Sequence, residues 1–240
     1  ASACQRAGMT RIDPTRPFVL LDDARDQDAS PARLYTDPLE ILSTRDPAEV
    51  PALIDRLRDG HWAGFLSYEA GHPLEPRLAA PAPPEEPLLW FTRFGGYAEI
   101  AAADVPALLP DPAGGWLGRV APDIGHAHYA EALAKVQALI AAGDIYQANL
   151  TLRASVSTAG APLALYAGMR ARAKAGYGGV IHTGEDWFLS LSPELFFALH
   201  NGHDLAVAFN DIDLSFGVRQ RNYHSSFALL TTAKINPHYV

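Results

Sequence analysis

The hydrophobic positions along the chain follow a helical period in some stretches and a strand-like pattern in others. Two stretches, residues 49–60 and 128–143, carry apolar residues three or four positions apart and end at a glycine, so both predict helices. These apolar positions are Val50, Leu53, Ile54 and Leu57 in the first stretch, and Tyr129, Leu133, Val136 and Ile140 in the second. Short apolar runs in "PFVLLDD", "WAGFLSYEAG" and "LLWFTRFGGYAEI" predict strands. The sequence therefore predicts an α+β fold with largely antiparallel sheets.

The stretch "GDIYQANLT", residues 143–151, follows the second predicted helix and alternates apolar with polar residues. Successive side chains of a strand point to opposite faces, so one face is polar and the other apolar. The polar face carries Gln147, Asn149 and Thr151, and the apolar face carries Tyr146, Ala148 and Leu150. A polar face of this kind is explained either by an exposed sheet or by a sheet that faces a ligand.

Composition limits what such polar groups can serve. The 240 residues are 48% hydrophobic and 19% charged, enough for the core of one large domain or two small ones. The net charge of -8, without a basic run, argues against nucleic acid as a partner. The single cysteine, Cys4, cannot form an internal disulfide, and no apolar run is long enough to cross a membrane. We expect a soluble cytoplasmic protein with neither nucleic acid nor membrane as a partner.

Metal and nucleotide sites have little support in the sequence. His126 and His128 alternate beside a helix start, but no third ligand follows at a recognisable spacing, so no metal ligand is assigned. The glycines of "AGYGGVIHTG" lack the Lys-Ser/Thr that completes a phosphate loop. We expect His182 to lie in a hairpin turn, with Glu185 and Asp186 as solvent-exposed turn acids.

Three stretches, "GFLSYEAG", "GDIYQANLT" and "LSLSPELFF", together resemble the chorismate-utilising enzymes. The resemblance is greatest to component I of aminodeoxychorismate synthase, which serves para-aminobenzoate and folate synthesis. It implies two large antiparallel sheets packed together with helices outside, and a substrate cleft between the sheets. It also implies chorismate as substrate, Mg²⁺ as cofactor, and a glutamine amidotransferase subunit that supplies ammonia. Two alternatives remain: anthranilate synthase component I, and a non-catalytic binding or partner module of the same fold.

The resemblance assigns a direction to the polar strand face. It implies that Gln147, Asn149 and Thr151 face the interior or the substrate cleft, with the apolar face against helices. The other interpretation is that these amides only satisfy neighbouring backbone groups. "WFLSLSPELFF" is expected to form a strand next to or near "IYQANLT", with Pro193 at a bulge or where the ladder needs no N–H.

A second pocket in the resembled enzymes binds tryptophan, and "LLDDAR" and "AKAGYGGV" occupy the places of its walls. Its candidate residues here are Leu21, Asp23 and Tyr177. Anthranilate synthases typically carry Leu-Leu-Glu-Ser at the first wall, and this chain lacks the serine. We therefore expect no tryptophan binding. The alternative for the adjacent acids is a solvated turn at the end of a strand.

The resemblance divides the chain into three parts. Residues 1–16 are an N-terminal extension, residues 17–197 match the N-terminal portion of a chorismate-utilising domain, and residues 198–240 diverge from the family. The Pro-Ile/Met-Lys-Gly-Thr-like motif that carries the family's proposed lysine nucleophile does not occur in the sequence, and neither do the glutamates expected to hold Mg²⁺. We assign no catalytic residue, and expect a truncated or frame-altered product that is inactive as this chain.

Overall fold

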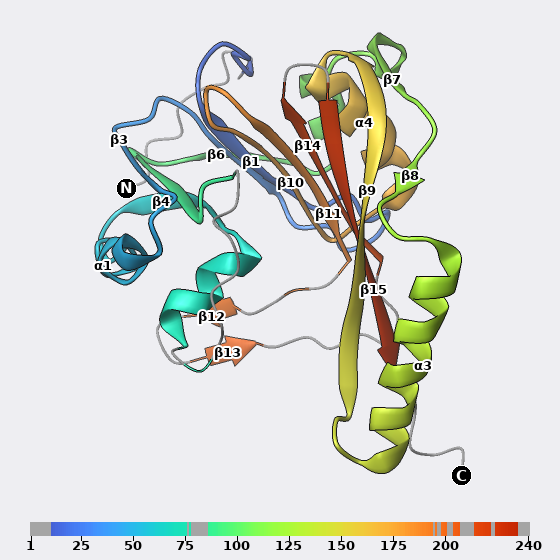
Figure 1. Cartoon of the computed structure of the whole chain (residues 1–240). Helices are drawn as coiled ribbons and strands as arrows, with labels where there is room; N and C mark the ends of the chain where they lie inside the picture. The colour runs from blue at the N-terminus through green and yellow to red at the C-terminus, as the bar shows by residue number, and fades with distance from the viewer. Residues whose placement is uncertain are drawn as a thin grey trace. The chain divides into compact units, whose positions relative to one another are not determined.

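The computed structural model describes residues 11–75, 77, 86–193 and 195, and the backbone of strand residues 198–200, 204–206, 214–221 and 224–234. The chain divides into two compact units. The first unit consists of residues 1–20, 33–100 and 181–184, and the second of residues 21–32, 101–180 and 185–240. The chain combines helices with antiparallel sheets, which confirms the predicted α+β class (Figure 1).

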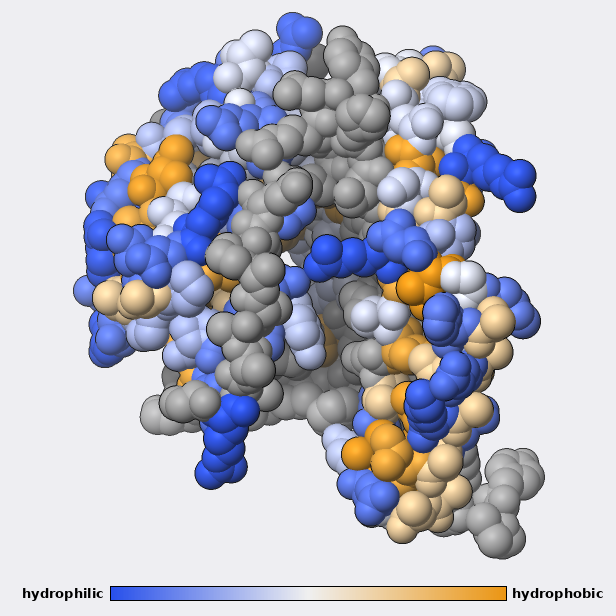
Figure 2. All heavy atoms as spheres, in the orientation of Figure 1, coloured by the Kyte–Doolittle hydropathy of each residue, from blue (hydrophilic) through white to orange (hydrophobic). Residues whose placement is uncertain are grey.

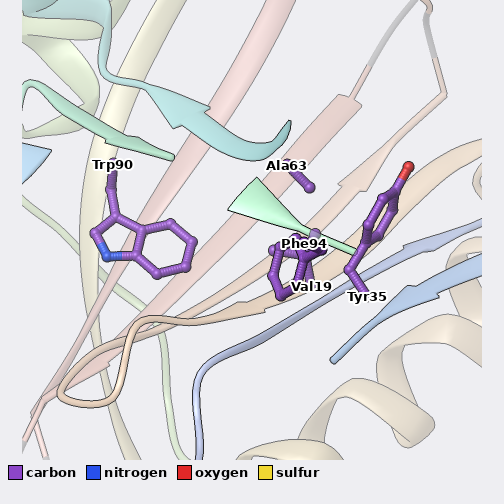
Figure 3. Close-up of a cluster of buried hydrophobic side chains, with 5 residues drawn as sticks. All are labelled: Val19, Tyr35, Ala63, Trp90 and Phe94. Carbon is purple, nitrogen blue, oxygen red and sulfur yellow. The ribbon is translucent and has the colours of Figure 1, made fainter. Parts of the chain in front are cut away.

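The first unit contains a three-stranded antiparallel sheet in the order β3 (Glu40–Thr44), β5 (Leu89–Phe94), β4 (His61–Leu66). It also contains β6 (Ala98–Ile100) and most of β2 (Ala32–Tyr35) and β1 (Phe18–Asp22). The buried side chains Val19, Tyr35, Ala63, Trp90 and Phe94 form a core cluster of this unit (Figure 3). The core of this unit is thus built from alternate residues of short strands.

A short helical segment covers a smaller core in the first unit. It begins with the 3₁₀ turn η1 (Pro47–Glu49) and continues as α1 (Val50–Asp55). Asp46 starts the turn, because its carboxylate accepts a hydrogen bond of 2.9 Å from the N–H of Ala48. Val50 packs in a buried cluster with Ala70 and Leu88, with Ile54 alongside. The predicted helix is therefore confirmed, although it ends before Leu57.

Only the first half of "WAGFLSYEAG" is a strand. β4 ends at Leu66, and residues Tyr68–Leu74 form the 3₁₀ segment η2. Within β4, Gly64 lies against the neighbouring strand so closely that an added Cβ would be 2.0 Å from the Trp90 carbonyl oxygen. A glycine is therefore required at this strand position by the close approach of the two backbones.

The second unit is organised around β9 (Gln147–Gly160), a strand of 14 residues. The order of its sheet strands is β11 (Trp187–Ser192), β14 (Leu214–Arg221), β15 (His224–Lys234), β9 and β7 (Gly115–Leu117), and β8 (Ala121–Pro122) also pairs with β9. All of these pairings are antiparallel. Strands β12 (Ala198–His200) and β13 (Asp204–Ala206) form a separate hairpin ladder.

Two longer helices belong to the second unit, together with α2 (Val105–Leu108) and the 3₁₀ turn η3 (Pro112–Gly114). Helix α3 (His126–Ala142) runs beside β9 and ends at Gly143, whose φ of 82° is the left-handed value that favours glycine (Figure 1). The helix and its end are as predicted, but none of its residues is fully buried. Figure 2 shows apolar and polar residues mixed over its surface. Helix α4 (Pro162–Ala173) instead buries five consecutive residues from Leu163 to Ala167.

The strand predicted in "WFLSLSPELFF" is present as β11. Strands β14 and β15 separate it from β9, so it lies in the same sheet but is not adjacent. Pro193 follows the last strand residue, Ser192, in a bend, where its missing N–H costs no ladder hydrogen bond. Glu194, Phe196 and Phe197 lie outside the described residues.

Candidate functional site

From Thr151 onward, β9 has one exposed and one buried face. Thr151 is exposed and Gln147 is half-buried, whereas Ala154, Val156 and Thr158 on the opposite face are buried. Exposure alternates along this part of the strand, but Gln147, Ala148 and Leu150 are all half-buried. Thr151 does not face the interior of this chain, and its place in a substrate cleft stays a prediction. The side chain of Asn149 lies outside the described residues.

The apolar face of the same stretch meets expectation only in part. Ala148 and Leu150 are half-buried, but Tyr146 is 78% exposed. Tyr146 precedes the strand, which begins at Gln147, so the strand alternation does not orient it. In the antiparallel pairing of β9 with β15, Gln147 lies opposite Lys234.

A buried ion pair anchors the end of β1 to α4. Asp22, whose side chain is fully buried, accepts hydrogen bonds from the Tyr166 hydroxyl at 2.8 Å and from Arg170 Nε at 2.6 Å. Arg170 also donates to the carbonyls of Asp23 and Ala102, each at 3.4 Å. Burial raises the pKa of the Tyr166 hydroxyl, and the neighbouring Asp22 carboxylate raises it further. These groups satisfy one another, so the arrangement is structural.

Asp23, a candidate of the tryptophan-like pocket, is also buried. Its Oδ1 and Oδ2 accept from Arg25 Nε at 2.9 Å and Arg25 Nη2 at 2.6 Å, and Oδ2 accepts from the Ser30 N–H at 2.9 Å. Burial acts to raise the pKa of Asp23, but the hydrogen bonds from Arg25 and Ser30 outweigh it and the pKa is lowered. The alternative of two solvated turn acids is therefore wrong, because Asp22 and Asp23 are each only 5% exposed.

The other two candidates of that pocket are both 41% exposed. Leu21 lies on β1, and Tyr177 begins β10 (Tyr177–His182). Tyr177 is close enough to Arg25 to contribute to the raised pKa of its guanidinium, after the larger effect of the Asp23 hydrogen bonds. Asp23 and Tyr177 thus both neighbour Arg25. Sequence reasoning overlooked Arg25, although an arginine two residues after the acid was the available signal.

The segment after β10 differs from its expected form. His182 is the last residue of β10, is only 4% exposed, and its Nδ1 lies 3.0 Å from the carbonyl oxygen of Arg16. Burial lowers the pKa of this imidazole, although the hydrogen bond to the carbonyl opposes the shift. Glu185 is exposed as expected, but Asp186 is 3% exposed. The expectation of an exposed Asp186 and of a turn position for His182 is wrong.

A hollow of about 470 Å³ is present on the first unit. Its lining residues are Glu40, Asp55, Arg56, Arg58, Asp59, Trp62 and Arg93. Their charges pair with one another: Glu40 binds Arg56 at 2.6 Å and Arg93 at 3.1 Å, and Arg58 binds Asp55 at 2.8 Å. An incoming dianion would have to displace these partners, so the hollow is a poor carboxylate site.

The described residues contain no group of three or more His, Cys, Asp or Glu side chains that could hold a metal ion. They therefore do not fit a Mg²⁺ site by themselves, and no step is assigned to a metal on this part of the chain. Within the same residues, no helix is both long and apolar enough to cross a membrane.

Comparison with known proteins identifies the family. The sequence profile of chorismate binding enzymes matches residues 16–206, which is most of the chain. The chain belongs to the chorismate binding enzyme family. A search among curated protein sequences found no match.

Two solved structures resemble the chain. Anthranilate synthase component I from Streptococcus pneumoniae is 12% identical, with a TM-score of 0.54 over 99% of this chain and 74% of that one. A Bacillus anthracis protein described as a 2,3-dihydroxybenzoate-specific isochorismate synthase is 11% identical, with a TM-score of 0.48 over 94% of this chain and 70% of that one. At these identities the first similarity shows the fold of the family and does not choose among its reactions.

Proposed function

We propose that this chain serves the amination of chorismate to 4-amino-4-deoxychorismate, as component I of aminodeoxychorismate synthase. The observation that carries the proposal is the match of residues 16–206 to chorismate binding enzymes. The finer choice rests on "YEAG" followed by "LEPRL", and on "YQANLT", which resemble the aminodeoxychorismate branch.

In this proposal the polar face of β9 contributes one wall of the substrate cleft. The amide of the half-buried Gln147 and the hydroxyl of the exposed Thr151 can hydrogen-bond the ring substituents of chorismate. They do so without placing a charge in the cleft, which avoids the desolvation cost of a buried ion. The exposure of this face supports the proposal because the groups are accessible to a ligand.

Two further components belong to the proposed reaction. Mg²⁺ would neutralise the carboxylates of chorismate and polarise the departing oxygen, a role that needs ligands beyond the described residues. A glutamine amidotransferase subunit would supply ammonia. Both are expectations from the resemblance in "GFLSYEAG", "GDIYQANLT" and "LSLSPELFF".

Anthranilate synthase component I is the second candidate, because the Streptococcus pneumoniae enzyme of that name shares the fold and the similarity does not choose between the two reactions. The two reactions separate by product. The purified chain is incubated with chorismate, Mg²⁺ and ammonium, and the products are resolved by chromatography with mass detection. Under the proposal any amination gives 4-amino-4-deoxychorismate, whereas anthranilate as the product would assign the chain to the other branch.

Binding of chorismate is tested separately by saturation-transfer NMR, since it does not require turnover. Gln147→Leu should weaken the chorismate signal because it removes the amide from the proposed wall. Ser155→Ala, an exposed position on the same face of β9, is the matched control and should leave the signal unchanged. Binding that is insensitive to Gln147→Leu would remove β9 from the site. Binding without turnover is the result expected of this chain by itself, whereas the absence of any chorismate binding would overturn the proposed substrate cleft.

A further inference from the structure

The hollow on the first unit is built from one row of the three-stranded sheet and from the turn after α1. Glu40, Arg93 and Trp62 lie directly opposite one another on β3, β5 and β4, so they share one face of the sheet. The rim of the hollow comes from the end of α1 and the residues that follow it, namely Asp55, Arg56, Arg58 and Asp59. The volume of about 470 Å³ lies in the range of small-molecule sites, which is roughly 300–1,000 Å³.

Two hydrogen bonds tie the rim of this hollow to the sheet. The indole N–H of Trp62 donates to the carbonyl oxygen of Asp59 at 2.9 Å, and Arg56 donates to Glu40 at 2.6 Å. Gly60 has a φ of 101°, in the left-handed region that favours glycine, and an added Cβ there would be 3.3 Å from the Cδ of Arg93. The turn that carries Asp59 is therefore held against the sheet without any ligand.

The ion pairs of Glu40 leave one positive charge over in the hollow. Glu40 binds Arg56 and Arg93 through one carboxylate oxygen each, so a single carboxylate faces two guanidinium groups. Arg93 uses only its Nε for this bond, and within the described part of the chain its two terminal nitrogens have no acceptor. These N–H groups can donate to one further carboxylate without displacing Glu40.

Asp59 leaves one negative charge over on the rim. Among the described residues its carboxylate has no hydrogen-bond or ionic partner, whereas Asp55 is paired with Arg58 at 2.8 Å. The lining as a whole is neutral, with an unpaired carboxylate on the rim and unused N–H donors on the sheet. A carboxylate alone gains little there because Asp59 repels it, and the excess positive charge on the sheet likewise repels a cation. A ligand that carries both charges satisfies both groups at once.

We propose that this hollow binds a zwitterion of about dipeptide size, whose ammonium group pairs with Asp59 and whose carboxylate accepts from Arg93. A free α-amino acid has both charges on one carbon, whereas the hollow has them on different elements, so a ligand with one peptide unit between its charges fits better. Its apolar part lies over the indole of Trp62, which lines the same hollow. The inference does not depend on the proposed function.

The affinity of this site should be weak. Asp59 is exposed and the Arg93 side chain is 40% exposed, so water and salt screen both contacts. We expect a Kd on the order of 1 mM for a dipeptide, and a higher Kd as the salt concentration rises.

The indole N–H of Trp62 is a local reporter for the test, which uses NMR on isotope-labelled protein. Glycyl-leucine is titrated into the full 240-residue chain and compared with N-acetyl-glycyl-leucine, which lacks the cation, glycyl-leucinamide, which lacks the anion, and free leucine. We expect a saturable shift of the Trp62 resonance with glycyl-leucine, and binding about 3- to 5-fold weaker for each of the other three. Loss of the signal in Trp62→Phe assigns it, and the resonance of the exposed Trp116 should not move.

Two substitutions identify the group that binds each end of the ligand. Asp59→Asn should remove the advantage of glycyl-leucine over its N-acetyl form. Arg93→Lys keeps a positive charge beside Glu40 but loses the spare terminal N–H groups, so it should reduce the advantage of glycyl-leucine over its amide. Asp104→Asn, at an exposed acid before α2 and outside the hollow, is the matched control and should change neither preference.

Three results would overturn the proposal. The first is equal binding of glycyl-leucine and its two blocked forms, or of glycyl-leucine and free leucine. The second is an Asp59→Asn variant that still distinguishes glycyl-leucine from its N-acetyl form. The third is a Trp62 resonance that moves with none of the four compounds at concentrations well above 1 mM, taken as roughly the expected Kd.

Discussion

At the scale of single residues, buried threonine hydroxyls differ in whether they have partners. Thr44 donates to Glu49 at 2.5 Å and accepts from the Asp46 N–H at 2.9 Å. Thr92, on the central strand of the same sheet, is completely buried, and its Oγ1 has no hydrogen-bond partner. Burying a hydroxyl without a partner costs desolvation free energy that no hydrogen bond offsets.

Thr92→Val should therefore leave the protein equally stable or make it more stable by about 1 kcal/mol, because valine has the same shape without the hydroxyl. Thr44→Val is the matched control and should cost about 1–2 kcal/mol, since it removes two hydrogen bonds. Urea unfolding measures both. A loss at Thr92 as large as that at Thr44 would mean that the Thr92 hydroxyl is bonded in solution.

The buried imidazole of His182 predicts a pH dependence of stability. Its folded-state pKa is lowered below the ordinary 6.5 by burial, so the unfolded chain binds a proton at a higher pH than the folded chain does. The free energy of unfolding should therefore fall as the pH drops below about 6.5. His182→Gln should flatten this slope in urea titrations between about pH 7.5 and 5. An unchanged slope would show that the ring does not titrate differently in the two states.

At the scale of the elements, the two glycine positions of "GFLSYEAG" differ in the space available for a side chain. An added Cβ at Gly64 on β4 would be 2.0 Å from the Trp90 carbonyl oxygen, whereas the space at Gly71 in η2 is open to 4 Å. Gly64→Ala should destabilise the protein by about 3 kcal/mol or more through forced separation of β4 and β5. Gly71→Ala should change stability by less than about 0.5 kcal/mol. Thermal and urea unfolding of the two variants tests whether the loss at Gly64 comes from the close approach of β4 and β5. A loss of the same size at Gly71 would instead indicate a general effect of replacing glycine.

Helix α4 offers a second comparison between elements. Arg170→Ala leaves the fully buried Asp22 carboxylate without its cation and should cost about 3–5 kcal/mol. Lys174→Gln breaks an ion pair whose partners are both more than half exposed, and should cost less than about 1 kcal/mol. Similar losses for the two variants, measured by urea unfolding, would contradict the structural role assigned to the buried pair.

Local signals explain which elements could be predicted from the sequence. The helix ending at Gly143 and the alternation in β9 depend on periodicity and a glycine in a left-handed conformation, both readable in a short window. The burial of Asp22 could not be read there, because its partner Arg170 is 148 positions away. The exposure of Thr151 likewise depends on what covers β9. Both the burial of Asp22 and the exposure of Thr151 depend on contacts between residues far apart in the sequence. A short window of sequence does not reveal such contacts.

At the scale of the whole molecule, the family was readable because three motifs in a fixed order are more specific than any one of them. The choice between the aminodeoxychorismate and anthranilate reactions stays a proposal, since it rests on the wording of "YEAG", "LEPRL" and "YQANLT" alone. The candidate site on β9 stays a prediction, because its orientation came from the resemblance, and Thr151 is exposed in this chain.

We predict that this chain by itself does not aminate chorismate at a useful rate. The Pro-Ile/Met-Lys-Gly-Thr-like motif does not occur in the sequence, and Thr151 on the polar face of β9 is exposed to solvent. Water there weakens electrostatic contacts to developing charge and removes the preorganisation that such catalysis needs. The assay with chorismate, Mg²⁺ and ammonium tests this on a preparation shown by mass to be the chain alone. Robust turnover would refute it.

The position of β15 between β14 and β9 determines the order in which the sheet of the second unit can be completed. The pairing places Gln147 opposite Lys234 and Ser157 opposite His224. This edge of β9 therefore remains unpaired until β15, many residues later in the chain, has been synthesised. During translation the backbone N–H and C=O groups along that edge of β9 are open to pairing with other chains. Pairing over such a sequence separation is also slow. Yield of native protein should therefore depend on chaperone capacity and on the rate of synthesis, more than the stability of the finished fold would indicate.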